Sequence, residues 1–379
     1  MLDTRCLRWL LVAALFLLIP ATCPAQVRFR IKKDQPPLPI DASTAETVID
    51  EVLKRLDEEY VFPDVATKMA QAVKKRQTDK EYAAIKTGQE LAQRLTKDLQ
   101  TVSKDKHLRI ICSTDKLPKP PRGRGAGSGP TIPPGMKERM RRHGAWLNGG
   151  YQKIERLAGN VGYLEIAGFP FAETAAEPAA AAMNFLTNTN ALIIDLRDNG
   201  GGEPQSVALL CSYFFDGKPV HLNSFYWRKG NRTEDFWTLK EVAGKRYLGK
   251  DVYLLTGPST ASGAEEFAYD LQTQKRAIVV GENTAGAAHP GGMSPLDDHF
   301  AMFVPTGRAI NPITKTDWEG SGIKPDVAVP ADQALERAHE LAIKKLLETT
   351  KDDDTRRLLQ MDLEHSGEHK MPKTARHDH

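Results

Sequence analysis

DVYLLTGPSTASGAEEFAYDLQ, residues 251–272, joins a strand-like apolar run to a helix-like segment through a turn of very small residues. Ser262 lies in that turn, and Ser262 and Glu265 have the spacing of a capping box, in which the serine oxygen satisfies an open backbone N–H group. The same position would expose the hydroxyl at the positive end of a helix dipole, which favours developing negative charge. The segment alone leaves two compatible roles open for Ser262, a helix cap and a nucleophile.

The surrounding sequence has the pattern of an α/β domain. From Tyr151 onward, β-rich apolar runs alternate with helix-like segments, and a final helix, DQALERAHELAIKKLLE, closes the region. The predicted strands are VGYLEIAGF, NALIIDLR, DVYLLTG, RAIVVGE and HFAMFVP, and the helices between them are AAEPAAAAMNFL, PQSVALLCSYFF and GAEEFAYDLQTQ. We therefore expect an α/β core over residues 149–346.

The remaining sequence divides by composition. Residues 44–112 carry apolar side chains at the i, i+3, i+4 spacing of amphipathic helices and predict a small helical domain, preceded by an extended segment at 26–43. Residues 113–148 are rich in Pro, Gly and Arg and predict a flexible basic linker. Residues 347–379 are polar and predict a disordered tail.

The N-terminus has the pattern of a secretory signal. In residues 1–25, basic residues precede the apolar run at 10–20, and small residues follow it. The run is short for a membrane span. We expect cleavage near Ala25 and a secreted or periplasmic protein with no stable membrane span; Thr22 is a poor fit to lipid attachment at Cys23.

Charge and cysteine content exclude several classes. The formal net charge is only +3, with 52 basic and 49 acidic residues, which gives no basic surplus for nucleic acid. Cys112 and Cys211 remain after the signal and lie in apolar surroundings, so buried thiols are expected, although a disulfide is left open. No cysteine spacing suggests a zinc site, and we predict no metal and no cofactor.

A glycine-rich turn follows one predicted strand. In IIDLRDNGGGEPQS, residues 193–206, three glycines end a buried run and could bring bare N–H groups close to a ligand. Such groups could cradle a phosphate or donate to an oxyanion, and a purely structural turn is the alternative; the phosphate-binding spacings are missing. The amide of Gly263 could pair with that of Gly201 or Gly202 as an oxyanion hole.

These motifs, taken in order, resemble the tail-specific protease superfamily, the S41 serine peptidases. The resemblance covers residues 44–112 and 149–346 and is strongest to the branch of the interphotoreceptor retinoid-binding protein repeats and the tricorn core. It implies a crotonase/ClpP-like α/β catalytic core, preceded by a small helical domain, with Ser262 as nucleophile. The 113–148 interval is too short for the PDZ-type domain that many relatives carry.

The resemblance also implies which groups activate Ser262. Ala287 stands near the place where one branch carries a lysine, so a serine–lysine dyad is not expected. The tricorn-like branch implies His107 as general base and Glu319 as the group that orients it, directly or through a hydroxyl or water. His289 is the rival base.

Three further charged residues have open or structural roles. Asp105 either caps a loop or positions the neighbouring histidine. Asp195 and Arg197 are interpreted as a scaffold beneath the glycine turn.

The expected function is a serine peptidase that hydrolyses unfolded proteins or peptides through an acyl-enzyme on Ser262. The alternative is a catalytically weak binder of an apolar, retinoid-like or fatty-acid-like ligand on the same fold. An acyl-CoA enzyme of crotonase type would share the oxyanion hole, but the predicted secretory signal argues against a cytosolic ligand. The oligomeric state is not predicted.

Overall fold

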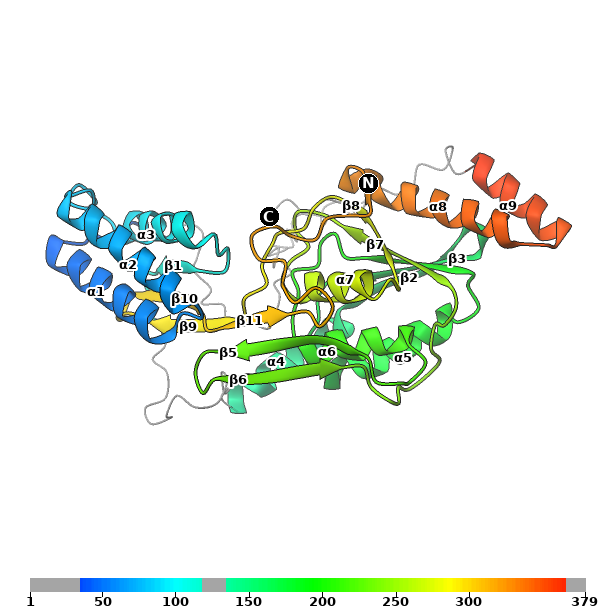
Figure 1. Cartoon of the computed structure of the whole chain (residues 1–379), viewed down its shortest axis with the longest axis horizontal. Helices are drawn as coiled ribbons and strands as arrows, with labels where there is room; N and C mark the ends of the chain where they lie inside the picture. Colours follow the sequence, from blue (N-terminus) through cyan, green and yellow to red (C-terminus); the bar gives the residue numbers. More distant parts are fainter. Residues whose placement is uncertain (1–34, 118–133, 366–379) are drawn as a thin grey trace, which may run out of the picture.

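The computed structural model describes residues 35–117 and 134–365 (Figure 1). The predicted signal peptide, its cleavage site near Ala25 and the lipid-anchor alternative at Cys23 lie outside these residues, as do residues 118–133 of the predicted linker. Within the two described ranges, no helix combines the length and apolar character needed to cross a bilayer.

A six-stranded sheet forms the centre of the α/β core. Its order is β12-β8-β7-β4-β3-β2, and neighbouring strands are parallel except for the antiparallel edge pair β2–β3. The strands are β2 (Tyr151–Leu157), β3 (Val161–Ile166), β4 (Ala191–Asp195), β7 (Asp251–Thr256), β8 (Ile278–Gly281) and β12 (Val327–Ala328). The central strands β4 and β7 are mostly apolar and buried because helices cover both faces, as is typical of parallel sheets.

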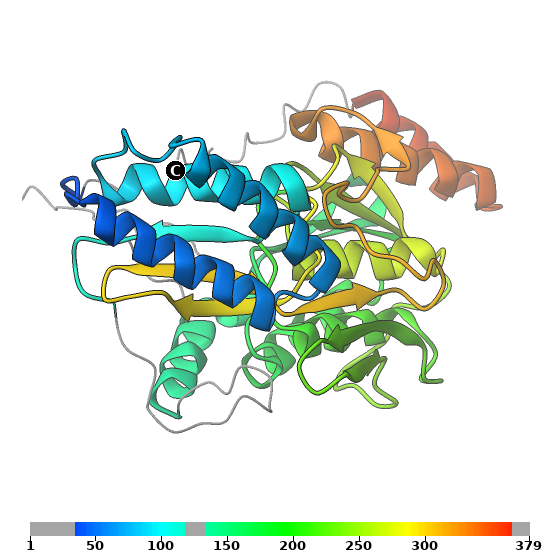
Figure 2. The same cartoon turned by 60° about the vertical axis from the view of Figure 1, so that its left-hand side comes forward.

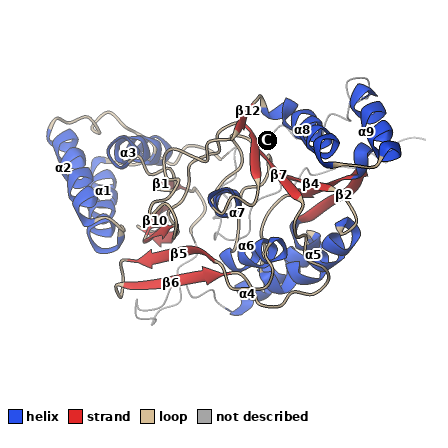
Figure 3. Cartoon of the chain, turned by 45° about the vertical axis from the view of Figure 1, so that its right-hand side comes forward, coloured by secondary structure: helices blue, strands red, loops and turns tan. Residues whose placement is uncertain are grey.

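The two faces of the sheet bury different side chains. In β4, Leu192 and Ile194 pack against one helical layer, whereas Ala191 and Ile193 pack against the other. The first layer contains α5 (Ala172–Leu186), α6 (Pro204–Cys211) and α7 (Gly263–Thr273), and the second contains α8 (Ala334–Thr349) and α9 (Asp353–His365) (Figure 3). The predicted α/β core is therefore confirmed.

The N-terminal helices form a second unit with its own hydrophobic core. They are α1 (Ala42–Glu59), α2 (Pro63–Thr78) and α3 (Gly88–Ser103), and they pack on the antiparallel sheet β1-β10-β9 (Figure 2). These strands are β1 (Arg109–Cys112), β9 (Gly291–Pro295) and β10 (Phe300–Pro305). The helical unit is thus completed by residues far along the chain, which the expected boundaries at 112 and 149 do not allow for.

This correction has a simple physical reason. The helical unit buries an apolar surface, and β10 supplies three large side chains to cover it: Phe300, Met302 and Val304. A third sheet, in the order β11-β5-β6, lies beside both units (Figure 1). Its strands are β5 (His221–Trp227), β6 (Arg232–Trp237) and β11 (Gly307–Ile310), and none of them was predicted.

Two predicted irregular segments contain helices. The expected disordered tail begins with α9, which is amphipathic: Leu359 is buried, and Asp362 accepts a hydrogen bond from the N–H of Gly159 at 2.7 Å. The end of the expected linker forms α4 (Pro134–Trp146), which lies against α5. Cys112 and Cys211 are buried free thiols, as expected.

We predict that the β10 contribution stabilises the helical unit strongly. Phe300 is fully buried, so Phe300→Ala should lower the free energy of unfolding by about 3–5 kcal/mol. Phe185 is 58% exposed, so the same change there should alter it by less than about 0.5 kcal/mol. Urea unfolding followed by circular dichroism measures both; similar losses in the two variants would contradict the assignment of β10 to this core.

Candidate active site

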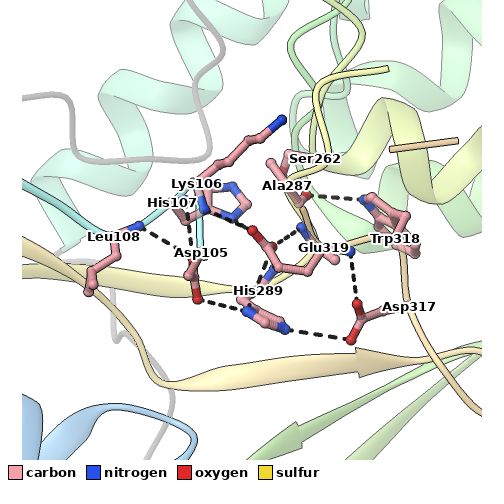
Figure 4. Close-up of polar contacts among 12 residues, drawn as sticks. Asp105, Lys106, His107, Leu108, Ser262, Ala287, His289, Asp317, Trp318 and Glu319 are labelled. Atoms are coloured by element: carbon pink, nitrogen blue, oxygen red, sulfur yellow. Dashed lines mark hydrogen bonds and ion pairs between the residues drawn. The ribbon is translucent and has the colours of Figure 1, made fainter. Parts of the chain in front are cut away.

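The candidate site lies where the strands of the central sheet end and α7 begins. A cavity of about 440 Å³ opens there, and its wall includes the side chains of Ser262 and His107 together with the backbone of Gly202 and Gly263. The helical unit contributes His107, and the α/β core contributes the other three residues. Figure 4 shows His107 and Ser262 among the polar groups around the site. The structure therefore brings together residues separated by about 155 positions (262 − 107).

Ser262 has an unusual backbone conformation. Its φ is 53° and its ψ is −122°, which is costly for a residue with a Cβ atom and is found where surrounding contacts enforce it. The N–H of Ser262 donates to Glu265 Oε2 at 2.9 Å, so the glutamate has the role that the capping box predicts for it. The turn holds the serine at the N-terminus of α7, directly on the cavity.

Glu265 has a second role that the sequence analysis missed. Its fully buried carboxylate also accepts hydrogen bonds from Thr284 Oγ1 at 2.5 Å, from the N–H of Gly286 at 2.6 Å and from the N–H of Ala287 at 2.9 Å. Burial raises the pKa of Glu265, and these hydrogen bonds oppose that rise. Glu265 therefore fixes the 284–287 segment against the serine turn.

Two of the three predicted oxyanion donors have open N–H groups: Gly202 in the glycine turn and Gly263 in the serine turn. The N–H of Gly201 donates to Asn199 Oδ1 at 2.8 Å, so this predicted oxyanion donor is wrong: its hydrogen is already used inside the turn. The N–H groups of Gly202 and Gly263 donate to no described residue. A Cβ atom on Gly202 would lie 1.9 Å from the carbonyl oxygen of Phe169, so the turn requires glycine there.

His107 is buried with one ring nitrogen directed toward Glu319. Its ring stacks on Phe303 at 5.7 Å between centroids, and its Nδ1 lies 3.9 Å from Glu319 Oε2 without a hydrogen-bond partner among the described residues. This arrangement leaves Nε2 as the nitrogen that can serve Ser262. The two side chains line the same cavity, and no hydrogen bond joins them in this structure.

Glu319 is held as a carboxylate by backbone donors. It accepts hydrogen bonds from the N–H groups of Lys106 at 2.9 Å, Ala288 at 2.6 Å and His289 at 3.0 Å. Burial would raise the pKa of Glu319, but the neighbouring His107 and His289 and the Lys106 donor outweigh it and lower the pKa. The carboxylate is thus charged and fixed beside the His107 ring.

His289 is bound between carboxylates, which argues against its role as a rival base. Its Nδ1 lies 2.7 Å from Asp105 Oδ2 and 3.6 Å from Glu319, and its Nε2 lies 3.5 Å from Asp317 (Figure 4). Burial would lower its pKa, but the hydrogen bonds to Asp105 and Asp317 prevail and raise it to about 10. At neutral pH both nitrogens carry protons, and neither can accept one from a serine.

Asp105 connects these groups. It is completely buried and accepts hydrogen bonds from the N–H groups of His107 at 3.1 Å and Leu108 at 3.3 Å, from the Tyr60 hydroxyl at 3.1 Å, and from His289. The hydrogen bonds from the N–H groups of His107 and Leu108 cap the loop and also position the histidine, so both roles considered for Asp105 come from the same contacts. It fixes the backbone that carries the His107 ring.

One oxygen or nitrogen atom from each of Asp105, His107 and Glu319 lies within 4.8 Å of the others, a spacing that would admit a small cation. However, both carboxylates already accept hydrogen bonds from backbone N–H groups and face His289. We assign no metal to this cluster.

Asp195 and Arg197 form the expected scaffold. Arg197 Nη2 lies 2.5 Å from Asp195 Oδ2, and Arg197 Nη1 donates to the carbonyl of Ala331 at 2.8 Å. Tyr163 donates its hydroxyl hydrogen to Asp195 at 2.8 Å. The pair supports the strand end from which the glycine turn begins.

The protonated His289 should make stability depend on pH. Its pKa rises from 6.5 when unfolded to about 10 when folded, so the folded protein holds the extra proton between these values. That stabilisation is complete below pH 6.5 and disappears as the pH rises through 10. Between pH 6.5 and pH 10, the free energy of unfolding should fall by roughly 2–4 kcal/mol more in the native protein than in His289→Gln. Urea titrations at several pH values measure this difference. If the free energy of unfolding changed with pH in the same way in both proteins, the raised pKa of His289 would be contradicted.

Comparisons with known proteins agree with this fold and order of motifs. The chain is 28% identical over 189 residues to a carboxyl-terminal-processing protease of Picosynechococcus, covering 49% of this chain and 43% of that protein. It is 27% identical over 175 residues to carboxyl-terminal-processing peptidase 2, chloroplastic, of Arabidopsis thaliana, covering 45% and 32%. The chain thus spans less than half the length of these curated relatives.

Two solved structures share the fold over most of their length. One, from Parabacteroides merdae, has a TM-score of 0.54 at 20% identity and covers 82% of this chain and 98% of its own. The other, a lipoprotein from Streptococcus agalactiae, has a TM-score of 0.51 at 16% identity and covers 82% and 99%.

Two family models account for most of the described chain. Residues 42–141 match the N-terminal domain of Peptidase_S41 in eukaryotic IRBP, and residues 160–329 match peptidase family S41. The first range contains His107 and the second contains Ser262 and Glu319. With both parts matched in the expected order, the chain belongs to peptidase family S41.

Proposed function

We propose that this protein is a serine peptidase that hydrolyses peptide bonds through an acyl-enzyme on Ser262. The observation that carries the proposal is the convergence of a strained serine, a buried histidine and two open backbone N–H groups on one cavity. The family membership and the carboxyl-terminal-processing relatives support a peptidase activity. A serine hydroxyl is a weak nucleophile at neutral pH and needs such a neighbouring base.

The proposed reaction has two halves, formation and hydrolysis of the acyl-enzyme, and the same groups act in both. His107 Nε2 takes the proton of the Ser262 hydroxyl as its oxygen attacks the peptide carbonyl, and then gives that proton to the departing amine. The N–H groups of Gly202 and Gly263 stabilise the oxygen anion of the tetrahedral intermediate. Water then attacks the acyl-enzyme by the same path and releases the acid. Glu319 stabilises the protonated ring and, with Asp105, is a positioning residue.

The proposed substrates are peptides or unfolded proteins. Hydrolysis requires a peptide carbonyl to lie beside Ser262, on the cavity of about 440 Å³. An extended segment can do this without disturbing a folded structure. The secretory pattern in residues 1–25 supports a secreted or periplasmic location for this activity.

Labelling with a fluorophosphonate probe tests the activated serine. We expect the native protein to be labelled and Ser262→Ala to lose all labelling, because the probe reacts with the nucleophilic oxygen. Ser259→Ala is the matched control: Ser259 is exposed in the same turn and should leave labelling unchanged. Labelling of Ser262→Ala, or none of a folded native protein, would contradict the proposal.

The same assay separates the two histidines. His107→Ala should slow labelling by about 10²- to 10⁴-fold, and added imidazole should restore part of the rate if the ring acts as a base. His289→Gln should slow labelling less and should show no rescue, because free imidazole does not replace the contacts of His289 with Asp105, Asp317 and Glu319. Rescue of His289→Gln alone would reverse the assignment.

Binding of an apolar ligand is the second candidate function. The cavity wall includes several aromatic side chains that could enclose such a ligand: Phe225, Trp227, Phe236 and Trp318. A binder does not need an activated serine. A folded protein that resists the probe but retains a lipid or chromophore through purification would favour this function over the peptidase.

A further inference from the structure

We infer that the cavity beside Ser262 selects substrates with a cationic side chain, lysine or arginine, at the residue whose carbonyl is attacked, and that Glu266, with the buried Asp270 behind it, recognises this cation. The inference rests on the proposed function and deepens it by naming the substrate class. It concerns the part of the cavity behind the serine, which the hydrolytic mechanism does not use.

The geometry of α7 places these carboxylates below the nucleophile. Residues four apart lie on the same face of a helix, about one turn of 5.4 Å apart. Ser262, Glu266 and Asp270 follow this spacing, and the N–H of Glu266 donates to the carbonyl of Ser262 at 2.9 Å. Glu266 lines the cavity together with Ser262, so a side chain that enters beside the serine can reach Glu266, whereas Asp270 does not line the cavity and lies one turn further along α7.

Both carboxylates are buried without a matching cation. Glu266 is 3% exposed and Asp270 is fully buried, and neither forms an ion pair with a described residue. Asn223 Nδ2 donates to Glu266 at 3.2 Å, whereas both oxygens of Asp270 and the amide oxygen of Asn223 have no hydrogen-bond partner among the described residues. A buried cluster with so many unused acceptors is costly unless a donor-rich cation joins it.

The ionisation of the pair agrees with this picture. Burial raises the pKa of Glu266 to about 7 although the Asn223 hydrogen bond opposes the rise. Burial together with the charge of Glu266 raises the pKa of Asp270, and the neighbouring Asn311 amide opposes that rise. A lysine or arginine side chain would supply both the charge and the N–H donors.

The walls of the cavity suit the rest of such a side chain. Phe225, Trp227, Phe236 and Trp318 would cover the methylene stem, and aromatic faces attract ammonium and guanidinium groups. The nearby Arg232 does not neutralise the pair: its guanidinium lies 3.5 Å from Glu234 and 5.5 Å from the Trp227 ring centre. The site therefore combines an apolar passage with an acidic end.

Matched peptides test the inference on the native protein. Fluorogenic peptides differing only at the residue before the cleaved bond would carry lysine, arginine, norleucine or glutamate, and kcat/KM would be measured for each. Norleucine has the lysine stem without the charge. We expect kcat/KM for lysine to exceed that for norleucine by about 10- to 100-fold, and glutamate to be the poorest. Equal or faster cleavage of the norleucine peptide would overturn the inference.

Variants assign the preference to the buried pair. Glu266→Gln should lower the lysine-to-norleucine ratio by at least about tenfold, and Asp270→Asn should lower it as an independent variant in case the first does not fold. Glu234→Gln is the matched control, because its exposed carboxylate at the cavity already pairs with Arg232, and its ratio should stay within about twofold of native. An unchanged ratio in folded Glu266→Gln and Asp270→Asn would also overturn the inference.

Fluorophosphonate labelling separates the two possible failures. A folded protein that neither reacts with the probe nor cleaves any peptide contradicts the proposed function itself. If the protein reacts with the probe and prefers the norleucine peptide, the proposed function stands and the inference about cationic side chains is overturned. If the probe reacts but no peptide is cleaved, the same peptides compete with the probe: protection by the lysine peptide alone supports the inference, and equal protection by norleucine overturns it.

Discussion

The candidate site depends on one buried imidazolium. His289 lies between Asp105 from the helical unit and Asp317 and Glu319 from the segment after β11, and it joins three parts of the chain that share no continuous strand or helix. Removing the imidazolium would leave buried carboxylates without their cation, which is far more costly than an exposed ion pair is worth. The cluster is therefore a strong positional constraint, and it lies immediately behind the proposed base.

This constraint explains how a base from one unit can serve a nucleophile from another. Asp105 holds the backbone of His107, Glu319 holds that of Lys106, and Lys106 Nζ donates to the carbonyl of Ala285 at 2.6 Å. Pairing of β1 with β10 supports the same contact from the other side, since His107 stacks on Phe303. A shift of the helical unit would disturb the charge cluster and the sheet together, so the two cores behave as one structure at this point.

Much of the fold follows from local pattern, whereas the site depends on contacts distant in sequence. The buried strands and the helices α5 to α8 were predictable because each has a continuous apolar run or a helical apolar stripe. The pairing of β10 with β1 was not, because an apolar run does not identify its partner strand. Ser262 and Gly202 could be singled out from small-residue turns, but the use of the Gly201 N–H by Asn199 depends on a side-chain hydrogen bond that no spacing reveals. His289 likewise resembled a base until its carboxylate neighbours were known.

The adjacent Glu265 and Glu266 show why charged residues on a helix are hard to interpret from sequence. A capping box accounts for the first, and the second would be read as a solvated residue of the opening turn. In the structure both are buried, and their side chains leave α7 about 100° apart, as 3.6 residues per turn requires. Glu265 meets four donors that use its oxygens fully, whereas Glu266 meets one donor and an acidic neighbour. The satisfied carboxylate therefore builds the turn, and the unsatisfied one retains the capacity to bind a cation that residues 35–117 and 134–365 do not supply.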